Sequence, residues 1–259
     1  MRILVTNDDG VTAPGLSALA AEMKSLGQVS VLAPDHNWSA SGHVKTMHRP
    51  LRVKEAVLLD GSPAWASDGA PSDCVALALL GFIPEKIDLV VSGINQGSNL
   101  GEDVLISGTV GAGLAAYLRG FPAVAISCDY ERWSTPYIKE VARFTALLVK
   151  RIGAVSLPSN LFLNVNMPNL PIDEIKGIKI ANLAHKSHVN TVEESHDGRR
   201  GYYMLVRQSV NHQVDKRSDI WVSNQGYISI SPLHLFLNDR LSPAFLDKIT
   251  TGLLEEFKK

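Results

Sequence analysis

Two adjacent acidic residues near the start of the chain, Asp8 and Asp9, are the first candidates for chemistry. They stand in the run Asn7-Asp8-Asp9-Gly10. Neighbouring side chains on a regular strand point to opposite faces, so the two carboxylates can act together only where a strand has ended and the chain turns. Gly10 allows such a turn because it lacks a Cβ atom. Carboxylates held close together repel each other and raise one pKa, and a divalent cation removes that repulsion.

Oxygen atoms from two later loops, the Ser39 hydroxyl and the Asn95 side-chain carbonyl, complete a candidate metal site with Asp8 and Asp9. An all-oxygen set of low charge suits Mg²⁺, Mn²⁺ or Ca²⁺, with water in the remaining positions. The alternative is a plain polar turn in which one aspartate caps a nearby group. For an isolated Asp-Asp-Gly that alternative is favoured, but a position directly after the first strand of an α/β sheet favours function.

A second candidate is the glycine-rich run that begins with Ser107, Gly108 and Thr109. It opens a predicted helix over 107–119, and the free N–H groups and positive dipole end of a helix start attract anions. The two hydroxyls add donors, and Gly108 lets an oxyanion approach the backbone. Simple N-capping by Ser107 is the alternative. Beside a metal site, phosphate binding is the favoured interpretation, and the two roles are compatible.

The elements that must position these groups alternate between strand and helix through the first two thirds of the chain. Apolar runs predict strands at 3–6, 29–33, 88–92, 123–127 and 161–165, and periodic stretches predict helices at 14–26, 71–80, 107–119 and 137–151. Such alternation indicates a doubly wound, mostly parallel, Rossmann-like α/β sheet over residues 1–168. We expect Thr12 to cap the helix that begins near Pro14. The loops after the first three strands should converge at one edge of this sheet.

The pattern changes in residues 169–259. Residues 184–201 are polar and lack a period, which favours a loop over a metal site for their histidines, His185, His188 and His196. Further elements are predicted after this segment: extended strands at 202–207 and 226–231, and a terminal helix at 242–257. Extended hairpin arms outside a doubly wound core often serve oligomerisation. We therefore expect this region to fold back on the core and to join copies of the chain.

Composition narrows the classes of partner. Lys and Arg number 25 and Asp and Glu number 26, a formal net charge of −1. This removes the basic excess typical of nucleic-acid or anionic-membrane binders, so we expect neither partner. The two cysteines, Cys74 and Cys128, lie in apolar stretches and are expected to be buried thiols. No apolar run is long enough for a signal peptide or a bilayer span, which predicts a cytoplasmic protein.

Six segments resemble the SurE survival-protein family, in order along nearly the whole chain. They are ILVTNDDG at 3–10, APD at 33–35 with the Ser-rich loop at 39–41, GAPSDCV at 69–75, SGINQGSNLG at 92–101, SGTVGA at 107–112 and GYISISPL at 226–233. The segments at 3–10 and 92–101 are highly specific together.

This resemblance implies a metal-dependent phosphatase that acts on nucleoside monophosphates, both 5′ and 3′, and in some members on short polyphosphate. It implies one divalent cation per subunit, Mg²⁺ or Mn²⁺ with Ca²⁺ as a substitute in crystals, held by Asp8, Asp9, Ser39 and Asn95. It also implies a phosphate site lined by Asn7, Asn99, Ser107, Gly108 and Thr109. Homodimers or homotetramers with exchanged C-terminal arms are the assemblies that the family implies.

The expected reaction is phosphomonoester hydrolysis, a 5′-nucleotidase activity, with Asp8, Asp9 and Asn7 as the catalytic residues. The cation would act as a Lewis acid on a phosphate oxygen, and the donors of the phosphate site would stabilise developing charge. The nucleophile is either water, with Asp8 or Asp9 as base, or Asp8 itself. The alternatives are a non-catalytic metal- and nucleotide-binding sensor and a purely structural assembly protein. The paired carboxylates argue against a sensor, because binding alone needs only one.

Overall fold

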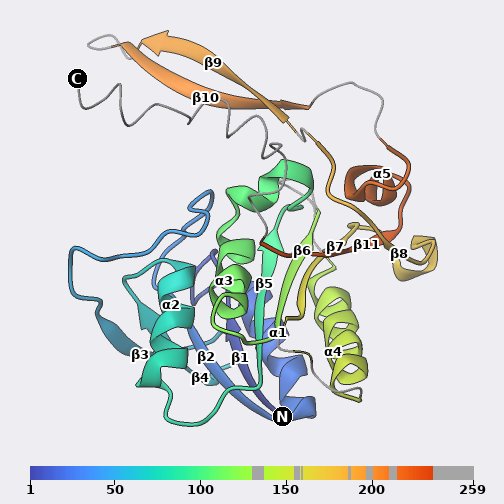
Figure 1. Cartoon of the computed structure of the whole chain (residues 1–259). Helices are drawn as coiled ribbons and strands as arrows, with labels where there is room; N and C mark the ends of the chain where they lie inside the picture. The colour runs from blue at the N-terminus through green and yellow to red at the C-terminus, as the bar shows by residue number, and fades with distance from the viewer. Residues whose placement is uncertain are drawn as a thin grey trace, which may run out of the picture.

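The computed structural model of the chain describes residues 1–129, 137–154, 158, 160–185, 188–196, 201–209 and 215–235. These residues form a nine-stranded sheet in the order β3-β4-β2-β1-β5-β6-β7-β11-β8 and a two-stranded sheet of β10 and β9. Figure 1 shows the large sheet at the centre of the molecule, covered by helices, and the small sheet projecting beyond one end. The architecture confirms the predicted α/β class.

The large sheet is mostly parallel, as predicted. Its strands are β1 (Arg2–Thr6), β2 (Gln28–Pro34), β3 (Val53–Val57), β4 (Pro63–Ser67), β5 (Leu89–Gln96), β6 (Ala123–Cys128), β7 (Phe162–Met167), β8 (Ile178–Ile180) and β11 (Ile228–Pro232). The two antiparallel neighbours are β3 beside β4 and β11 beside β7. All the other neighbouring pairs are parallel. The short strands β3, β4 and β8 are additions to the predicted set.

Five helices accompany the sheet in the described residues. They are α1 (Pro14–Met23), α2 (Pro71–Leu77), α3 (Gly108–Tyr117), α4 (Ile138–Ala154) and α5 (Asp219–Asn224), with shorter helical turns at Lys24–Leu26, Ala78–Phe82, Gly101–Leu105 and Ile172–Glu174. The N-cap of α1 is Ala13, which makes no side-chain cap. The predicted cap by Thr12 is therefore wrong. Pro14 at the first helical position has no N–H to satisfy, and its fixed φ already favours a helix start.

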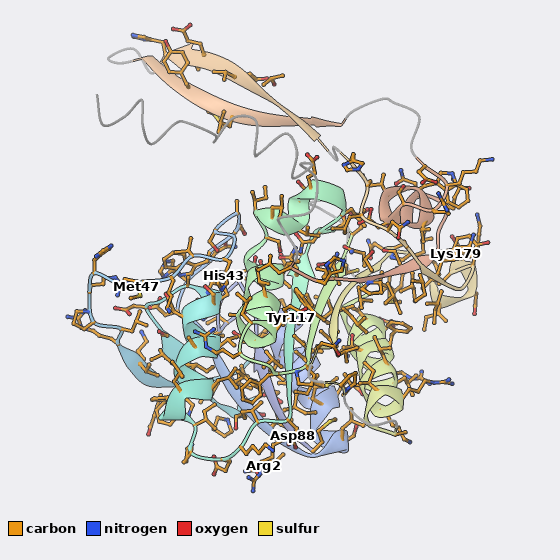
Figure 2. All side chains as sticks on the ribbon, in the orientation of Figure 1. Arg2, His43, Met47, Asp88, Tyr117 and Lys179 are labelled. Carbon is orange, nitrogen blue, oxygen red and sulfur yellow. The ribbon has the colours of Figure 1, made fainter. Side chains whose placement is uncertain are left out.

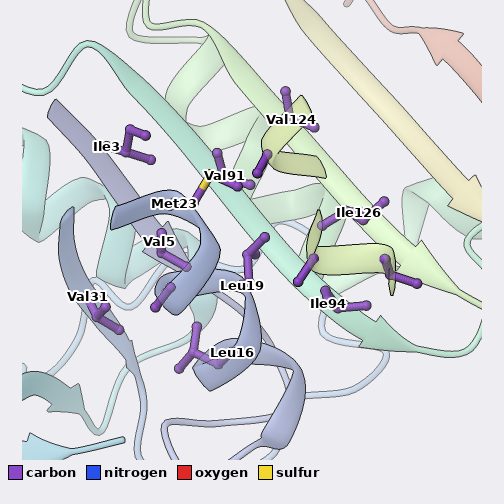
Figure 3. Close-up of a cluster of buried hydrophobic side chains, with 14 of the residues drawn as sticks. Ile3, Val5, Leu16, Leu19, Met23, Val31, Val91, Ile94, Val124 and Ile126 are labelled. Atoms are coloured by element: carbon purple, nitrogen blue, oxygen red, sulfur yellow. The ribbon is translucent and has the colours of Figure 1, made fainter. Parts of the chain in front are cut away.

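Alternation along the strands separates two hydrophobic cores. Ile3 and Val5 of β1 belong to a cluster that includes residues of α1 and α4, whereas Leu4 belongs to a cluster that includes residues of α2 and α3. In Figure 3, Leu16 and Leu19 of α1 lie over the central strands. Both leucines are fully buried, and replacing such a residue with alanine typically costs about 2–5 kcal/mol. The two cores hold the strands, and therefore the loops at their carboxyl ends, in fixed positions.

Residues beyond 168 contribute to the same sheet, because β11 pairs with β7 and β8. β9 (His188–His196) and β10 (Gly201–Ser209) form the antiparallel hairpin that projects from the body. The predicted strands at 202–207 and 226–231 are confirmed. The interpretation of 184–201 as a loop is wrong for β9, because ladder hydrogen bonds with β10 hold a polar segment that has no hydropathy period. The predicted terminal helix at 242–257 lies outside the described residues.

The two cysteines are buried and free, as predicted. Burial raises the pKa of the Cys128 thiol to about 12 and that of Cys74 further still. Both thiols are therefore protonated at neutral pH and serve as packing groups. Among the helices that the structure describes, none combines the length and apolar character needed to cross a bilayer.

Candidate metal and phosphate site

The direction of chain winding reverses at β1. β1 pairs in parallel with β2 on one side and with β5 on the other. The chain therefore leaves β1 toward one edge of the sheet and later returns to its opposite side, which opens a crevice beyond the carboxyl ends of β1 and β5. Thr6 lies in register with Ser92, so the turn after β1 is adjacent to the last residues of β5. This edge is where Asp8 and Asn95 meet.

Asn7 closes the turn that follows β1. Its Nδ2 donates to the Gly10 carbonyl oxygen (3.0 Å), and its Oδ1 accepts from the Gly10 N–H (3.2 Å). Gly10 has a φ of +100°, a conformation that residues with a Cβ rarely adopt. Asn7 is fully buried and is not one of the residues that line the cavity at this edge. The structure therefore places Asn7 in this turn, and its contact with phosphate stays a prediction.

Asp8 is held at the start of α3, with 2% of its surface exposed. Its Oδ1 accepts a hydrogen bond from the Thr109 hydroxyl, and its backbone carbonyl accepts from the Trp38 N–H (2.8 Å). Burial raises the pKa of Asp8, while the Thr109 hydroxyl and the N–H groups at the helix start act in the opposite direction. A carboxylate in this position faces the positive end of a helix but is removed from water.

Asp9 lies beside Asp8 and is only partly buried. Burial, and then the charge of Asp8, raise the pKa of Asp9 to about 6. The Gln96 N–H donates weakly to its Oδ2 (3.4 Å). Within the described residues, no Lys, Arg or His forms an ion pair with either carboxylate. Two neighbouring acidic groups thus have no basic side chain of the described residues paired with them.

A cavity of about 200 Å³ opens beside Asp8. Its walls include five of the predicted site residues: Asp8, Ser39, Asn95, Asn99 and Ser107. Asn95 donates through Nδ2 to the Gly97 carbonyl oxygen (2.7 Å), which leaves its Oδ1 for another partner. The structure therefore brings the loops after β1, β2 and β5 to one cavity, as the sequence predicts.

These donors fit a hard divalent cation. Carboxylate, hydroxyl and amide oxygens are the ligands that Mg²⁺, Mn²⁺ and Ca²⁺ prefer, and a cation would balance the two carboxylates that lack a basic partner. In the described part of the chain, no cluster of three or more His, Cys, Asp or Glu side chains is placed to hold a metal. The candidate set is of another kind, because it combines only two carboxylates with a hydroxyl and an amide.

The start of α3 forms the wall next to Asp8. Ser107 is the N-cap, and its Oγ accepts from the Val110 N–H (3.1 Å), so the hydroxyl proton is still available to donate toward the cavity. A Cβ on Gly108 would lie 2.7 Å from the Asp8 Cβ, so only glycine allows this approach. Gly108 and Thr109 do not line the cavity themselves. They contact Asp8 and position it.

A family model described as "Survival protein SurE" matches residues 3–190 of the chain. The chain belongs to the SurE family. It is 46% identical over 255 residues to a 5′-nucleotidase SurE of Dehalococcoides mccartyi (strain CBDB1), which covers 98% of this chain and 96% of the relative. It is 43% identical over 249 residues to a 5′-nucleotidase SurE of Geotalea daltonii, which covers 96% of this chain and 98% of that relative. The motif resemblance is therefore confirmed.

The fold agrees with a solved SurE structure. The crystal structure of the SurE protein from Aquifex aeolicus has a TM-score of 0.80 and 34% sequence identity, over 98% of this chain and 100% of that one. The Rossmann-like fold predicted from the strand and helix alternation is confirmed over the length of the SurE chain.

Asn99 lines the cavity of this SurE chain and is held from behind by polar side chains that sequence analysis missed. Its Nδ2 donates to Ser127 Oγ (2.8 Å), and its backbone N–H donates to Asn166 Oδ1 (2.7 Å). Asn164 and Asn166 both donate to the Asn99 carbonyl oxygen (2.8 and 3.0 Å). The second hydrogen of Asn99 Nδ2 is left for a ligand. The sequence does carry a sign of these contacts, because Asn164 and Asn166 stand at alternating positions in a strand that is otherwise apolar.

Proposed function

We propose that this chain is a divalent-metal-dependent phosphatase that hydrolyses nucleoside 5′-monophosphates to nucleoside and phosphate. The main support is the pair of Asp8 and Asp9. They are acidic groups with raised pKa values and no basic partner in the described residues, beside a cavity at the ends of β1 and β5. The curated relatives named 5′-nucleotidase SurE support the same activity.

The cation would be held by Asp8, Asp9, Ser39 and Asn95, and we propose Mg²⁺ or Mn²⁺, one per subunit. When bound, it supplies Lewis-acid polarisation of a phosphoryl oxygen. The four residues come from the loops after β1 and β2 and from the end of β5, and the two hydrophobic cores hold these strands in place. Asn7, Gly108 and Thr109 act on this set indirectly, since they fix the turn and the orientation of Asp8.

The phosphate group would be bound by the Ser107 hydroxyl and the Asn99 amide, which line the same cavity as Asp8. Donors that are already in position stabilise the charge that develops on the phosphoryl oxygens, at no cost of reorganisation. The hydrogen bond that Asn99 donates to Ser127, and those that it accepts from Asn164 and Asn166, serve this purpose because they hold Asn99 in place.

Water is the nucleophile that the geometry favours. Asp8 is almost fully buried, and Thr109 occupies its Oδ1, which suits a fixed ligand better than an attacking group. Asp9 is more exposed, which supports it as the residue that accepts a proton. In the proposed step a water oxygen attacks phosphorus, its proton passes to Asp9, the ester P–O bond breaks, and the nucleoside leaves with a proton from solvent.

The test is release of inorganic phosphate from 5′-AMP in the presence of Mn²⁺. We expect turnover by the wild-type protein, loss of turnover with EDTA, and recovery when Mn²⁺ is added back. Asp8→Asn should lower turnover strongly, even with excess Mn²⁺. Binding of 5′-AMP without phosphate release would instead identify a sensor, and near-normal turnover by Asp8→Asn would refute the proposed site.

We further propose that residues 1–168 perform the chemistry in the cytoplasm, and that 3′-nucleotides and short polyphosphate are additional substrates.

We also propose that residues 169–259 join copies of the chain through exchanged arms. The β9–β10 hairpin supports this assembly. Val192 is paired with Leu205 and lies 61% exposed, and Leu205 is 77% exposed. A second copy would cover this apolar pair. Light scattering should find a dimer or tetramer for the full chain, and a monomer when the hairpin is replaced by a short linker.

A further inference from the structure

Asp219, the first residue of α5, is a buried carboxylate outside the site described so far. It is fully buried. Its Oδ2 accepts from the Gly101 N–H (2.8 Å), and its Oδ1 accepts from the N–H groups of Ala184 and Ile220 (both 2.9 Å). No ion pair involves Asp219 among the described residues. Burial raises the pKa of Asp219, and these backbone N–H groups from three places in the chain act in the opposite direction.

One of these N–H groups belongs to the loop of the phosphate site. Gly101 lies two residues after Asn99 and opens the helical turn that leads to Ser107. The turn is continuous with the helix start, because the Ser107 N–H donates to the Asp103 carbonyl oxygen (3.0 Å). A displacement of Gly101 would therefore move both residues that we assign to phosphate binding.

A second N–H group belongs to the segment that leads into the hairpin. Ala184 precedes β9 by a few residues. A Cβ on Gly101 would lie 2.8 Å from the Ala184 carbonyl oxygen, so the two segments are in direct contact. The Asp219 N–H also donates to the Asn182 carbonyl oxygen (2.8 Å). One side chain thus ties the phosphate loop to the beginning of the arm.

α5 itself is anchored on the edge of the large sheet. Lys179 of β8 places its Nζ 5.1 Å from the centre of the Trp221 ring and 4.0 Å from that of Tyr227, and Figure 2 shows Lys179 beside α5. Cation–π contacts of this kind stabilise the position of a short helix. These contacts hold α5, and therefore the backbone of Asp219, in place on the edge of the sheet.

From this geometry we infer that Asp219 is a positioning residue that holds the loop 97–107 in place for phosphate binding by tying it to the base of the β9–β10 arm. The inference rests on the proposed function, since it concerns the phosphate half of that site. Hydrogen bonds to a carboxylate are roughly twice as strong as neutral ones. Three of the four proposed metal ligands, Asp8, Asp9 and Ser39, lie on other loops, so metal binding should not depend on Asp219.

The test is Asp219→Asn, which keeps the shape but replaces one acceptor oxygen by an NH₂ group that cannot accept. By calorimetry, we expect Mn²⁺ affinity within about twofold of wild type and affinity of the Mn²⁺-loaded protein for inorganic phosphate to fall about tenfold or more. With 5′-AMP, kcat should fall by about 10–100-fold, the size of effect that a misplacement near 1 Å produces.

The matched control is Ser218→Ala. Ser218 caps the same helix by accepting from the Trp221 N–H (3.3 Å), so its loss weakens α5 while leaving the Asp219 carboxylate in place. We expect a lower melting temperature, with unchanged phosphate affinity and kcat. This separates a positioning effect from a general loss of stability.

The inference is overturned if Asp219→Asn keeps wild-type phosphate affinity and kcat, or if it loses Mn²⁺ and phosphate binding together. Should Asp219→Asn fail to fold, hydrogen exchange on the wild-type protein decides. The Gly101 and Ala184 amides should be protected to a similar degree, and more than those of Ser98 and Glu102; fast exchange at Gly101 overturns the inference. Neither the binding assays nor hydrogen exchange requires turnover, so a wild-type protein that does not hydrolyse 5′-AMP would refute the proposed function alone.

Discussion

Asp8 and Asp219 are both buried carboxylates beside a helix start, yet their surroundings differ. Asp219 has each oxygen paired with backbone N–H groups, and no second acid of the described residues contributes to its pKa shift. Asp8 shares its place with Asp9, lines a cavity, and has the Thr109 hydroxyl as its hydrogen-bonding side-chain partner. A buried charge must be balanced by something. Asp219 is held by backbone N–H groups, whereas Asp8 and Asp9 are the residues that we propose to hold a cation. We call Asp219 an anchor and the Asp8–Asp9 pair the proposed ligands.

The largest expected effect is that of Asp8→Asn. We expect 5′-AMP turnover to fall about 10³-fold or more, because a metal ligand worth several kcal/mol of transition-state stabilisation is lost. In EDTA at pH 7, the same variant should unfold at a higher temperature than wild type, because burial disfavours the Asp8 charge. Burial raises the pKa of Asp219 as well, but Asp219→Asn should unfold at a lower temperature, because it breaks at least one hydrogen bond between this carboxylate and the backbone. If the melting temperatures of Asp8→Asn and Asp219→Asn changed in the same direction, the proposed difference between Asp8 and Asp219 would be wrong.

The next effect is the pH dependence of stability that Asp9 should cause. Asp9 has a folded-state pKa of about 6 against an ordinary 3.8, so the folded protein binds this proton more tightly than the unfolded chain. The resulting penalty is absent below about pH 4, grows as the pH rises toward 6, and is complete above it. Two pK units correspond to roughly 3 kcal/mol.

Urea unfolding from pH 4.5 to 7.5 in EDTA measures this penalty. The free energy of unfolding of the wild-type protein should fall across the window relative to that of Asp9→Asn, and Mn²⁺ should remove the difference. Parallel profiles for the two metal-free proteins would show that Asp9 is not destabilised by its neighbour.

The sequence was sufficient to predict that Asp8, Ser39 and Asn95 meet at one cavity, and it was insufficient to predict the role of Asp219. Asp8, Ser39 and Asn95 could be found because each follows a predicted strand, and parallel strands bring their carboxyl ends to one edge. Asp219 could not be found, because its partner Gly101 lies 118 residues away and the connection runs through strands, such as β9, that have no hydropathy period. The hydrogen bonds between Asn7 and Gly10 were not predicted either, since the residue type of Asn7 suits phosphate and gives no sign that its amide closes this turn.

A third buried aspartate, Asp73 near the start of α2, resembles Asp219 because backbone N–H groups donate to its carboxylate. Its oxygens accept from the Ala70 N–H (3.0 Å), the Thr46 N–H (3.0 Å) and the Thr46 hydroxyl (2.7 Å). Asp73→Ala should lower stability by about 2 kcal/mol, because it leaves buried donors unpaired. Mn²⁺ affinity should change less than about threefold, since the segment near Ser39 is held separately by the Trp38 N–H on Asp8. Thermal melting measures the change in stability, and Mn²⁺ titration measures the change in affinity. A large loss of Mn²⁺ affinity would mean that Asp73 contributes to metal binding.

The smallest expected effect comes from changing Thr46, which donates hydrogen bonds to Asp73. Thr46→Val removes one hydroxyl donor to Asp73 and keeps the backbone N–H that also donates to it. We expect a loss of about 1 kcal/mol, a melting shift of roughly 2–4 °C for a chain of this size. In an Asp73→Ala background the same substitution should cost almost nothing, because its partner is already gone. Additive costs in this double-mutant cycle would mean that Thr46 stabilises the protein through other contacts, and that Asp73 is anchored by backbone N–H groups alone, as Asp219 is.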